Sequence, residues 1–492
     1  MAYKHGAYGE ILASKVKSTQ QSDSVALYIG TAPINLIRGY ADADLVNMPI
    51  KVANMSDTQR KLGYADDWAA FTLCEVFAQH FDNTVGNVGP IYILNVLDPD
   101  THRAEAETTK ELTFKNNRAE FDSNDIILDT FAIADKVEDV DYSLEYNFTK
   151  GTVIVKLLKD IDKDTLECSY NTVDVSLVTE DDIIGYTSQN GEYTGLHALK
   201  LLYQNHNAVL NTLAAPGWSH IPKVYKAMVS IVQKLNGHWD GFINADIPLV
   251  DAANSDAPIN TMEKAIEWKE KNGYTSEFSK VYWPKIKDGT GRIYHLSTVG
   301  QATMLRVDLA NKNVPFESPS NKQIMATQQY FGEGTKHRGY DQQTCNTLNE
   351  KGITTACYWA SQWVLWGPHT AAFTYNGSHD ARAIFDVNLR MLMHITNSFQ
   401  LDHGTKIDSP MTPQEKDSIL NYEQQKLDAL VAVGALIGTP TVEFIETENP
   451  VTDMINGDFV WNFNVTNTPP FKSGTARVCY TDEGFAAFFE TE

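Results

Sequence analysis

The residues of this 492-residue chain that are best suited to chemistry do not form a complete catalytic or nucleotide-binding motif. Gly332–Lys336 (G-E-G-T-K) comes nearest to a phosphate-binding loop, but it lacks the spacing of G-x-x-x-x-G-K-[ST]. Gly217–Ile221 (G-W-S-H-I) approaches the nucleophile elbow G-x-S-x-G, yet Ile221 stands where the tight turn needs its second glycine. We therefore interpret Ser219 as a helix N-cap.

Histidines and cysteines give no metal pattern either. Four histidines lie in the last third of the chain, near Asp380 and Asp402, without H-x-x-x-H or H-E-x-x-H spacing: His369, His379, His394 and His403. The cysteines are odd in number and scattered, with no C-x-x-C: Cys74, Cys168, Cys345, Cys357 and Cys479. This pattern favours buried thiols in a reducing compartment, polar or interface histidines, and neither a metal nor a cofactor.

Composition narrows the possible partners. The chain carries 40 Lys and Arg against 63 Asp and Glu, a net charge of −23, which argues against binding nucleic acid or an anionic membrane. Its 42% hydrophobic and 11% aromatic residues indicate folded cores. Met1–Gly6 has no apolar signal core, and no run approaches the ~18 apolar residues of a membrane span. We expect a folded protein that is made and kept in a cytoplasm.

The elements needed to position any site alternate between strand and helix. Val25–Gly30 and Pro90–Leu97 are typical of buried strands, and apolar spacing predicts a helix centred on residues 67–81. Residues 194–312 alternate helical and strand patterns, which predicts an α/β layer with a largely parallel sheet. The segment from Asp98 to Asp182 contains 22 acidic and nine basic residues, a net charge of −13.

Short alternating runs in this acidic region, such as Lys150–Leu157 and Thr172–Leu177, predict strands with one solvated face. Near the end of the chain, a helix is expected at Ala381–Ser398, and Thr412–Glu415 is a capping box that starts another. A strand with one aromatic face is predicted from Phe459 to Val465, and a short strand at Thr475–Tyr480.

Leu348–Ile353 (L-N-E-K-G-I) and Val364–Thr370 (V-L-W-G-P-H-T) match the patterns L-N-x-x-G-I and W-G-x-x-T. Together with other segments, in order along nearly the whole chain, they resemble the tail sheath proteins of contractile bacteriophages and related injection machines. Weaker similarities occur at Tyr3–Tyr8, Val25–Pro33, Leu62–Tyr64, Ala215–Gly217, Tyr282–Pro284, Arg306–Asp308 and Pro315–Asn321, where Ser320 replaces the family's usual Ala.

The resemblance implies a multidomain α/β plus β architecture. We expect an extended arm at 1–24, an α+β part of the core at 25–97, and an inserted acidic β-sandwich at 98–190. A non-catalytic, subtilisin-like α/β domain would follow at 191–340, then a C-terminal α+β polymerisation domain at 341–466 and a C-terminal arm at 467–492. The net charge of −13 predicts that the insertion faces outward and is dispensable for polymerisation.

By the same resemblance the protein is a structural subunit rather than an enzyme. It would stack as hexameric rings around a tail tube and contract to drive the tube through a cell envelope. The implied partners are other copies of the chain, the tube protein, and baseplate and tail terminator proteins, with no direct nucleic acid and no membrane insertion. The implied location is the tail of a phage or bacteriocin particle, assembled in the host cytoplasm.

We expect the two arms to couple neighbouring subunits, because a strand with unpaired backbone groups and an apolar face is satisfied by joining another sheet. The arm residues are Tyr3, His5, Tyr8, Phe471, Tyr480, Phe485, Phe488 and Phe489. The expected acceptor strand carries Phe459, Trp461, Phe463 and Val465.

Arg382 and Arg390 lie eight residues apart, near one helical face, and are candidates for the tube contact, although an intramolecularly paired helix face is equally consistent. Two other functions stay open. One is a hydrolase built on the α/β domain, with Ser219 as the residue that an activity probe would label. The other is a different structural tail component, which would form small closed oligomers instead of tubes.

Overall fold

The computed structural model describes residues 20–21, 24–159, 165–254, 257–335 and 339–489. Its centre is a mixed sheet of eight strands in the order β21-β20-β16-β13-β12-β2-β5-β3. The strands are β2 (Ala26–Gly30), β3 (Pro49–Val52), β5 (Ile91–Asn95), β12 (Thr212–Ala214), β13 (Phe242–Asp246), β16 (Ser279–Tyr282), β20 (Ile353–Trp359) and β21 (Gln362–Trp366). The inner pairs are parallel, whereas β3 and β21 are antiparallel to their neighbours at the two edges.

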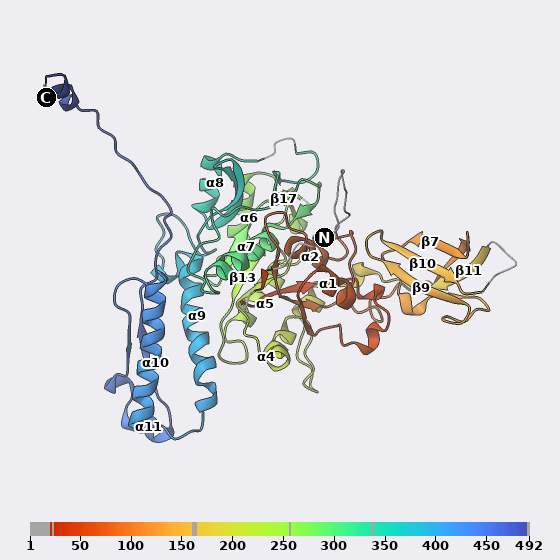
Figure 1. The fold of residues 1–492 in the computed structure, drawn as a ribbon, viewed down its shortest axis with the longest axis horizontal. Helices are drawn as coiled ribbons and strands as arrows, with labels where there is room; N and C mark the ends of the chain where they lie inside the picture. The colour runs from red at the N-terminus through yellow and green to blue at the C-terminus, as the bar shows by residue number, and fades with distance from the viewer. Residues whose placement is uncertain (1–19, 22–23, 160–164, 255–256, 336–338, 490–492) are drawn as a thin grey trace, which may run out of the picture.

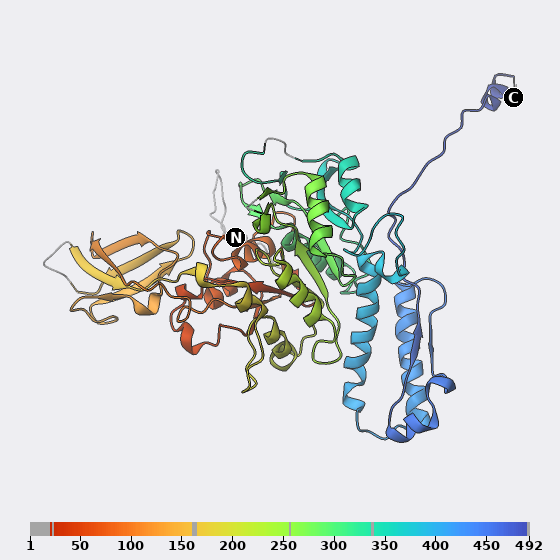
Figure 2. The same ribbon diagram turned by 180° about the vertical axis from the view of Figure 1, so that it is seen from behind.

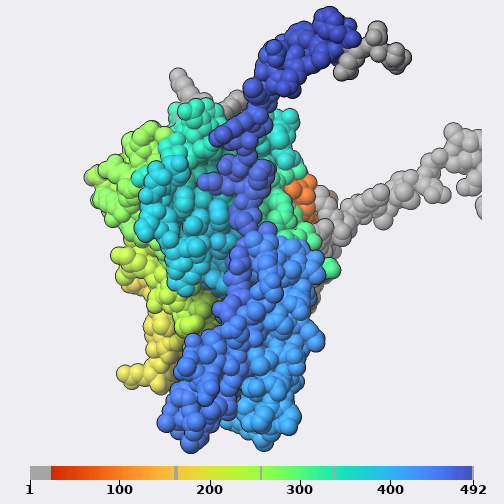
Figure 3. Space-filling view, turned by 90° about the vertical axis from the view of Figure 1, so that its left-hand side faces the viewer, coloured from red at the N-terminus to blue at the C-terminus, as the bar shows by residue number. Residues whose placement is uncertain are grey.

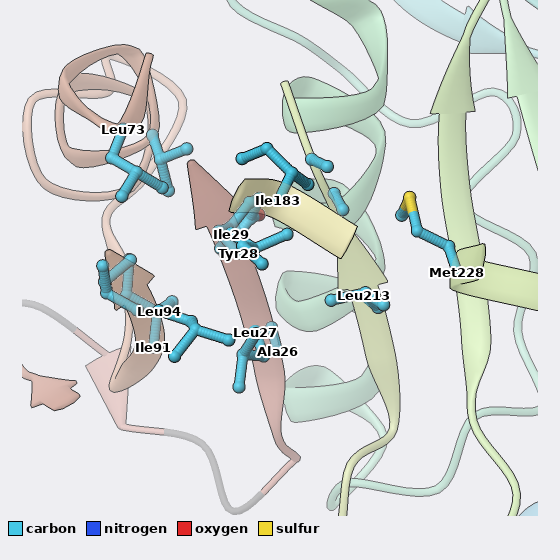
Figure 4. Packing of buried hydrophobic residues seen from close by; sticks show 14 of the residues in the cluster. Ala26, Leu27, Tyr28, Ile29, Leu73, Ile91, Leu94, Ile183, Leu213 and Met228 are labelled. Atoms are coloured by element: carbon cyan, nitrogen blue, oxygen red, sulfur yellow. The ribbon is translucent and has the colours of Figure 1, made fainter. Parts of the chain in front are cut away.

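Helices pack on this sheet in two groups. Helices α2 (Leu73–Phe81) and α7 (Leu296–Ala310) contact each other, while α3 (Glu180–Ile184) packs against α5 (Pro222–Val232). Figure 4 shows Ile183 of α3 in the same core as side chains of β2, β5 and β12. The remaining helices of this body are α1 (Met55–Leu62), α4 (Leu201–His206), α6 (Met262–Asn272) and α8 (Gln342–Asn349). The predicted α/β alternation is therefore present.

Small sheets complete the body. β1 (Gln20–Gln21) runs parallel to β4 (Val88–Gly89), and β14 (Val250–Asp251) pairs with β15 (Ala257–Pro258). A three-stranded antiparallel sheet consists of β18 (Ile293–Tyr294), β17 (Lys285–Lys287) and β19 (Gln328–Tyr330).

The acidic region forms two three-stranded antiparallel sheets with a common core. One sheet contains β7 (Arg118–Asp122), β10 (Thr152–Leu157) and β9 (Tyr142–Asn147), and the other β6 (Thr108–Thr113), β11 (Thr165–Tyr170) and β8 (Ala132–Ile133). Residues of β7 alternate between exposed and buried, as expected for strands with one solvated face. This unit lies at one end of the molecule, away from α9 and α10 (Figures 1 and 2).

The boundary of this unit is narrower than the expected 98–190. Val173, Val178 and Ile183 are buried in the core of the α/β body, not in that of the two small sheets. The predicted strand at Thr172–Leu177 is wrong, because residues 175–177 form a 3-10 turn. Asp174 accepts hydrogen bonds from the backbone and the hydroxyl of Ser176, which holds the turn.

The C-terminal part is a hairpin of two long helices, α9 (Asp386–His403) and α10 (Pro413–Ala432). Thr412 accepts a hydrogen bond from the Glu415 backbone at 3.2 Å, as the capping box predicts, but the Glu415 carboxylate pairs with Lys406. Helix α11 (Val451–Asn456) and the ribbon of β22 (Thr441–Glu443) and β23 (Asn462–Asn464) accompany the hairpin. Beyond it the chain runs outward into solvent (Figure 1).

The helix predicted around residues 67–81 begins only at Leu73. The Thr72 N–H donates to the Thr31 hydroxyl, and the Leu73 N–H donates to the Thr31 carbonyl. These bonds hold the residues before Leu73 in a loop against the segment that follows β2.

Candidate assembly surface

The C-terminal arm makes little contact with its own subunit. Every residue from 471 to 489 is exposed, and the arm passes over the hairpin region before leaving the body (Figure 3). The exposed fractions of its large apolar side chains include 90% for Phe471, 93% for Val478 and 81% for Phe488. Such a run of unpartnered apolar side chains is typical of a segment that docks elsewhere.

The arm has no strand at Thr475–Tyr480, so that prediction is wrong for the single subunit. An extended segment is counted as a strand only when its backbone groups pair with a neighbour, and no partner strand lies beside these residues in the described chain. Residues 483–488 instead form a 3-10 turn that stacks Phe485 on Phe488, with ring centroids 6.1 Å apart. Tyr3, His5 and Tyr8 of the expected N-terminal arm lie outside the described residues.

The expected acceptor strand is shorter than its sequence pattern. β23 includes Phe463 but neither Phe459, Trp461 nor Val465. Asn449 explains why β23 does not extend back to Phe459. Its side-chain amide accepts from the Val460 N–H (2.8 Å) and donates to the Val460 carbonyl (3.0 Å). These bonds occupy the backbone groups that would otherwise extend the ladder.

The aromatic face itself is present and packs on α9. The Phe399 ring lies 5.9 Å from that of Trp461 and 5.6 Å from that of Phe463, measured between centroids. A groove of about 420 Å³ runs between α9 and residues 459–465. Phe399 was not among the residues proposed from the sequence, although it follows the predicted helix Ala381–Ser398 directly and continues its apolar spacing.

The candidate tube contact at Arg390 is wrong. Its side chain is 4% exposed and its guanidinium forms an ion pair with Asp308 of α7. Burial raises the pKa of Asp308, and the adjacent Arg390 charge opposes that change. Arg382 lies in the 3-10 turn before α9, so the two arginines do not share a helix face; it pairs with Glu277 at 2.9 Å and is half exposed.

A second buried ion pair lies beside the first. The Lys280 ammonium of β16 lies 2.8 Å from the Asp386 carboxylate at the start of α9, and both side chains are fully buried. Burial lowers the pKa of Lys280, whereas the Asp386 charge raises it. These two pairs join α9 to the central sheet and to α7. No local sequence pattern indicates them, because the partners are far apart in the chain.

The arrangement around Ser219 does not support hydrolysis, and the N-cap interpretation is also wrong. Ile221 occupies the cap position of α5, and the Ser219 hydroxyl accepts from the Asp246 backbone N–H at 3.0 Å. No histidine hydrogen-bonds Ser219 in the described part of the chain. His295 instead bonds Glu75, with 2.8 Å between Nδ1 and Oε2. The Ser219 hydroxyl donates to the Asp246 carboxylate at 3.4 Å and is fully buried, so it lacks both the histidine base and the exposure of an activated nucleophile.

Histidines and cysteines are mostly structural. Burial lowers the pKa values of His369 and His394 to about 4. Cys74, Cys168, Cys345 and Cys357 are buried free thiols as predicted, but Cys479 on the arm is exposed. Among the described residues no group of histidine, cysteine and acidic side chains could hold a metal ion, and no helix is long and apolar enough to cross a membrane.

Sequence comparison links the whole chain to one class of protein. It is 24% identical over 477 residues to the tail sheath protein of Burkholderia phage BcepMu, and the alignment covers 92% of each chain. Over nearly its whole length the chain is therefore similar to a phage tail sheath protein. The tail sheath protein of Escherichia phage P2 is 22% identical over 311 residues, which are 63% of this chain and 72% of that one.

Solved structures agree at the level of the fold. The chain matches a chain of the anti-feeding prophage baseplate with a TM-score of 0.56 and 14% identity, covering 98% of this chain and all of that one. It matches the contracted helical sheath of the same prophage with a TM-score of 0.53 and 14% identity over 98% and 100% of the two chains. No family model matches the sequence. These relatives are named as tail sheath proteins, which are structural components of a tail.

Proposed function

We propose that this chain is the repeating subunit of a contractile sheath. It polymerises as stacked hexameric rings around a tail tube and contracts to drive the tube through the host envelope. Near-complete coverage of a phage tail sheath protein supports this function. The observation that carries it is the arm at residues 471–489, whose aromatic side chains are exposed in the single subunit and need a partner.

The partner of the arm is a neighbouring copy of the chain. A free strand with an apolar face gains backbone hydrogen bonds and burial by adding to the edge of another sheet. The ribbon β22–β23 supplies such an edge, since each of its strands has only one strand neighbour in the described chain. The N-terminal arm at 1–24, with Tyr3, His5 and Tyr8, would join the same small sheet.

Flexible connections let such coupling persist during contraction. Residues 469–474 include Pro469, Pro470 and Gly474 and lack helix or strand, so their dihedral angles can absorb a rotation of the body while the paired strands stay together. Coupling between neighbours makes a small free-energy change in each subunit propagate along the lattice.

The remaining partners are the tail tube, the baseplate and the tail terminator. The hairpin α9–α10 lies at the opposite end of the molecule from the acidic sandwich (Figure 1), which suits an inner position for the hairpin and an outer one for the sandwich. With Arg390 buried, Arg382 is the arginine of the original pair that stays available to the tube. The protein is then a component of the particle tail, assembled in the host cytoplasm around a non-catalytic, subtilisin-like α/β domain.

Truncation tests the arm directly. We expect the full chain to sediment as polymers of very high mass, and a chain ending at Pro470 to remain a folded monomer with an unchanged cooperative melt. Removing residues 1–20 should have the same effect. Polymers from either truncated chain, or loss of the fold, would place the coupling contacts elsewhere.

A further inference from the structure

The root of the C-terminal arm, residues 470–474, lies beside a cavity of its own subunit. This cavity has a volume of about 410 Å³, and residues 470–473 form one wall of it. The other walls come from the body, and they include residues of three segments singled out in the sequence: 315–321, 348–353 and 364–370. The assembly proposed above gives this cavity no role.

The walls on the body side are held by hydrogen bonds. The Trp366 indole N–H donates to the Asn346 side-chain oxygen at 2.9 Å, and the Gly367 N–H donates to the Ser320 hydroxyl at 3.0 Å. The Asn349 side-chain amide donates to the Trp366 carbonyl at 3.0 Å. Because these bonds link all three segments, the cavity is formed before anything enters it.

Aromatic side chains make this cavity suitable for another aromatic ring. The rings of His369 and Phe373 lie parallel, with centroids 3.6 Å apart, and Trp366 and Tyr375 also line the cavity. Burial lowers the pKa of His369 to about 4, so its ring is neutral at neutral pH. Neutral aromatic walls favour the burial of an apolar ring.

Phe471 is the large apolar side chain nearest to this cavity along the arm. It belongs to the lining, yet it is 90% exposed. Its ring lies against the arm itself, since a Cβ atom on Gly474 would come within 2.5 Å of the ring. The ring is therefore beside the cavity but not in it.

The chain just before Phe471 is fixed to the subunit. The Thr468 N–H donates to the Ala435 carbonyl at 3.2 Å, and its hydroxyl donates to the Gly434 carbonyl at 2.7 Å. Three residues span at most about 11 Å, so Phe471 cannot move far from the cavity. Such a short tether gives the ring a high effective concentration there, which favours it over any ring that must arrive from another chain.

We propose that Phe471 is a latch that turns into this cavity when the arm pairs with a neighbouring subunit. The latch rests on the arm pairing proposed above. In the free subunit, closing it must order residues 471–474 in return for the burial of one ring. Pairing of the arm restricts these residues first, so that closing then loses less conformational entropy. The latch is open in the single subunit and closed in the lattice.

A closed latch changes how the arm is connected to the body. The arm then leaves its own subunit at a fixed point, and the segment that absorbs rotation shortens to residues 472–474. The three lining segments thereby gain a role in assembly, because they form the seat of the latch.

The test places a photoreactive ring at the latch. The full chain carries Phe471→p-azidophenylalanine, which keeps the phenyl ring and adds only an azide group. This variant is made with heavy isotopes and mixed with an excess of light, unmodified chain, so that the unmodified chain drives assembly. After irradiation, mass spectrometry identifies the cross-linked peptides. A heavy–heavy pair joins residues of one chain, and a heavy–light pair joins two copies.

We expect position 471 in polymers to link to residues 366–375 as heavy–heavy pairs. The unassembled subunit should give this link less often by about fivefold or more, the lower end of typical coupling between two sites. The matched control is Val478→p-azidophenylalanine. Val478 is also exposed (93%), but it lies in the part of the arm that pairs with a neighbour, so it should give heavy–light pairs.

The two positions separate the latch from the arm pairing. The latch alone is overturned if position 478 links to other copies while position 471 links only to other copies or to the arm. Equal linking of position 471 to residues 366–375 in free and assembled subunits would also overturn it. If the full chain forms no polymers, or position 478 links only within its own chain, the arm pairing fails and the latch fails with it.

Discussion

Buried charges at the base of α9 are expected to control the stability of the subunit. Arg390→Ala would leave the buried Asp308 carboxylate without its partner, at a cost of about 3–5 kcal/mol in the free energy of unfolding. Arg382→Ala is the matched control, because it removes a half-exposed pair with Glu277 whose loss costs ~1 kcal/mol or less. Denaturant unfolding followed by tryptophan fluorescence measures the free energy of unfolding of both variants. Equal losses of stability would contradict the different roles assigned to the buried Arg390 pair and the half-exposed Arg382 pair.

Buried histidines make the fold sensitive to acid. Burial lowers the pKa values of His80, His220, His369 and His394 from 6.5 to about 4. Between these values the unfolded chain binds more protons than the folded one, so stability falls as the pH drops from about 6.5 toward 4. Each histidine contributes about 1.4 kcal/mol per pH unit in this window.

His80 offers a check on this pH dependence. Its Nδ1 donates to the Val88 carbonyl at 2.8 Å, and its Nε2 accepts from the Tyr28 hydroxyl at 2.7 Å, so both nitrogens are used in the neutral ring. His80→Gln should flatten the fall in the midpoint of denaturant unfolding between pH 7 and pH 5, even if it lowers the midpoint at both. An unchanged slope would show that this ring is not kept neutral in the fold.

Residue type alone predicted the burial of four of the five thiols, but it missed the exposed Cys479 and did not show which charges pair. Arg390 and Asp308 are on different helices, and an eight-residue spacing from Arg382 says nothing about what faces α9. Ser219 shows the same limit. Its hydroxyl is bound by Asp246, a partner that only the parallel pairing of β12 and β13 brings close.

At the scale of elements, the aromatic turn at residues 483–488 is expected to be needed for assembly only. Replacing Phe485, Phe488 and Phe489 by Ser removes side chains that are exposed in the subunit, so the melting temperature should not change while polymer formation falls sharply. Val451→Ser with Ile455→Ser is the control, since these residues of α11 are also exposed (66% and 78%) but lie outside the arm. Sedimentation measures the amount of polymer. An equal loss of polymer in the control would mean that exposed apolar side chains promote association wherever they lie, not only in the arm.

Elements with strong local signals were predictable. Helix α10 begins at the capping Thr412 and its Pro413, and the parallel strands carry continuous apolar runs. Elements that depend on a partner were not. The predicted strand at Thr475–Tyr480 has no neighbour within the subunit, and Asn449 shortens the one at Phe459–Val465 through contacts that no local pattern contains.

At the scale of the molecule, the acidic sandwich is expected to be dispensable for polymerisation. The Ala104 N–H donates to the Thr172 carbonyl at 2.9 Å, so a short Gly/Ser linker can bridge the two ends left when residues 105–171 are removed. Leu36→Ser belongs in the same variant, because Leu36 packs in the sandwich core and would become exposed. Electron microscopy should show narrower polymers of unchanged repeat. A folded variant that forms none would mean that the sandwich takes part in the lattice.

Part of the domain arrangement could be predicted from the sequence. Alternating helix and strand patterns, the acidic β region and the order of the segments were all visible, because each depends on local composition. The strand order of the central sheet was not, since β2 pairs with β12 and β5 across large separations in the chain. The end of the insertion was also hidden, because Val173, Val178 and Ile183 are apolar in either case and only their packing assigns them to the body.

Negative-stain electron microscopy of the purified full chain tests the central claim most directly. If the protein is a sheath subunit, raising its concentration should give long hollow tubes with sixfold symmetry when viewed end-on. The chain ending at Pro470, imaged beside it at the same concentration, should give none. Discrete closed oligomers or monomers from the full chain under these conditions would contradict the account.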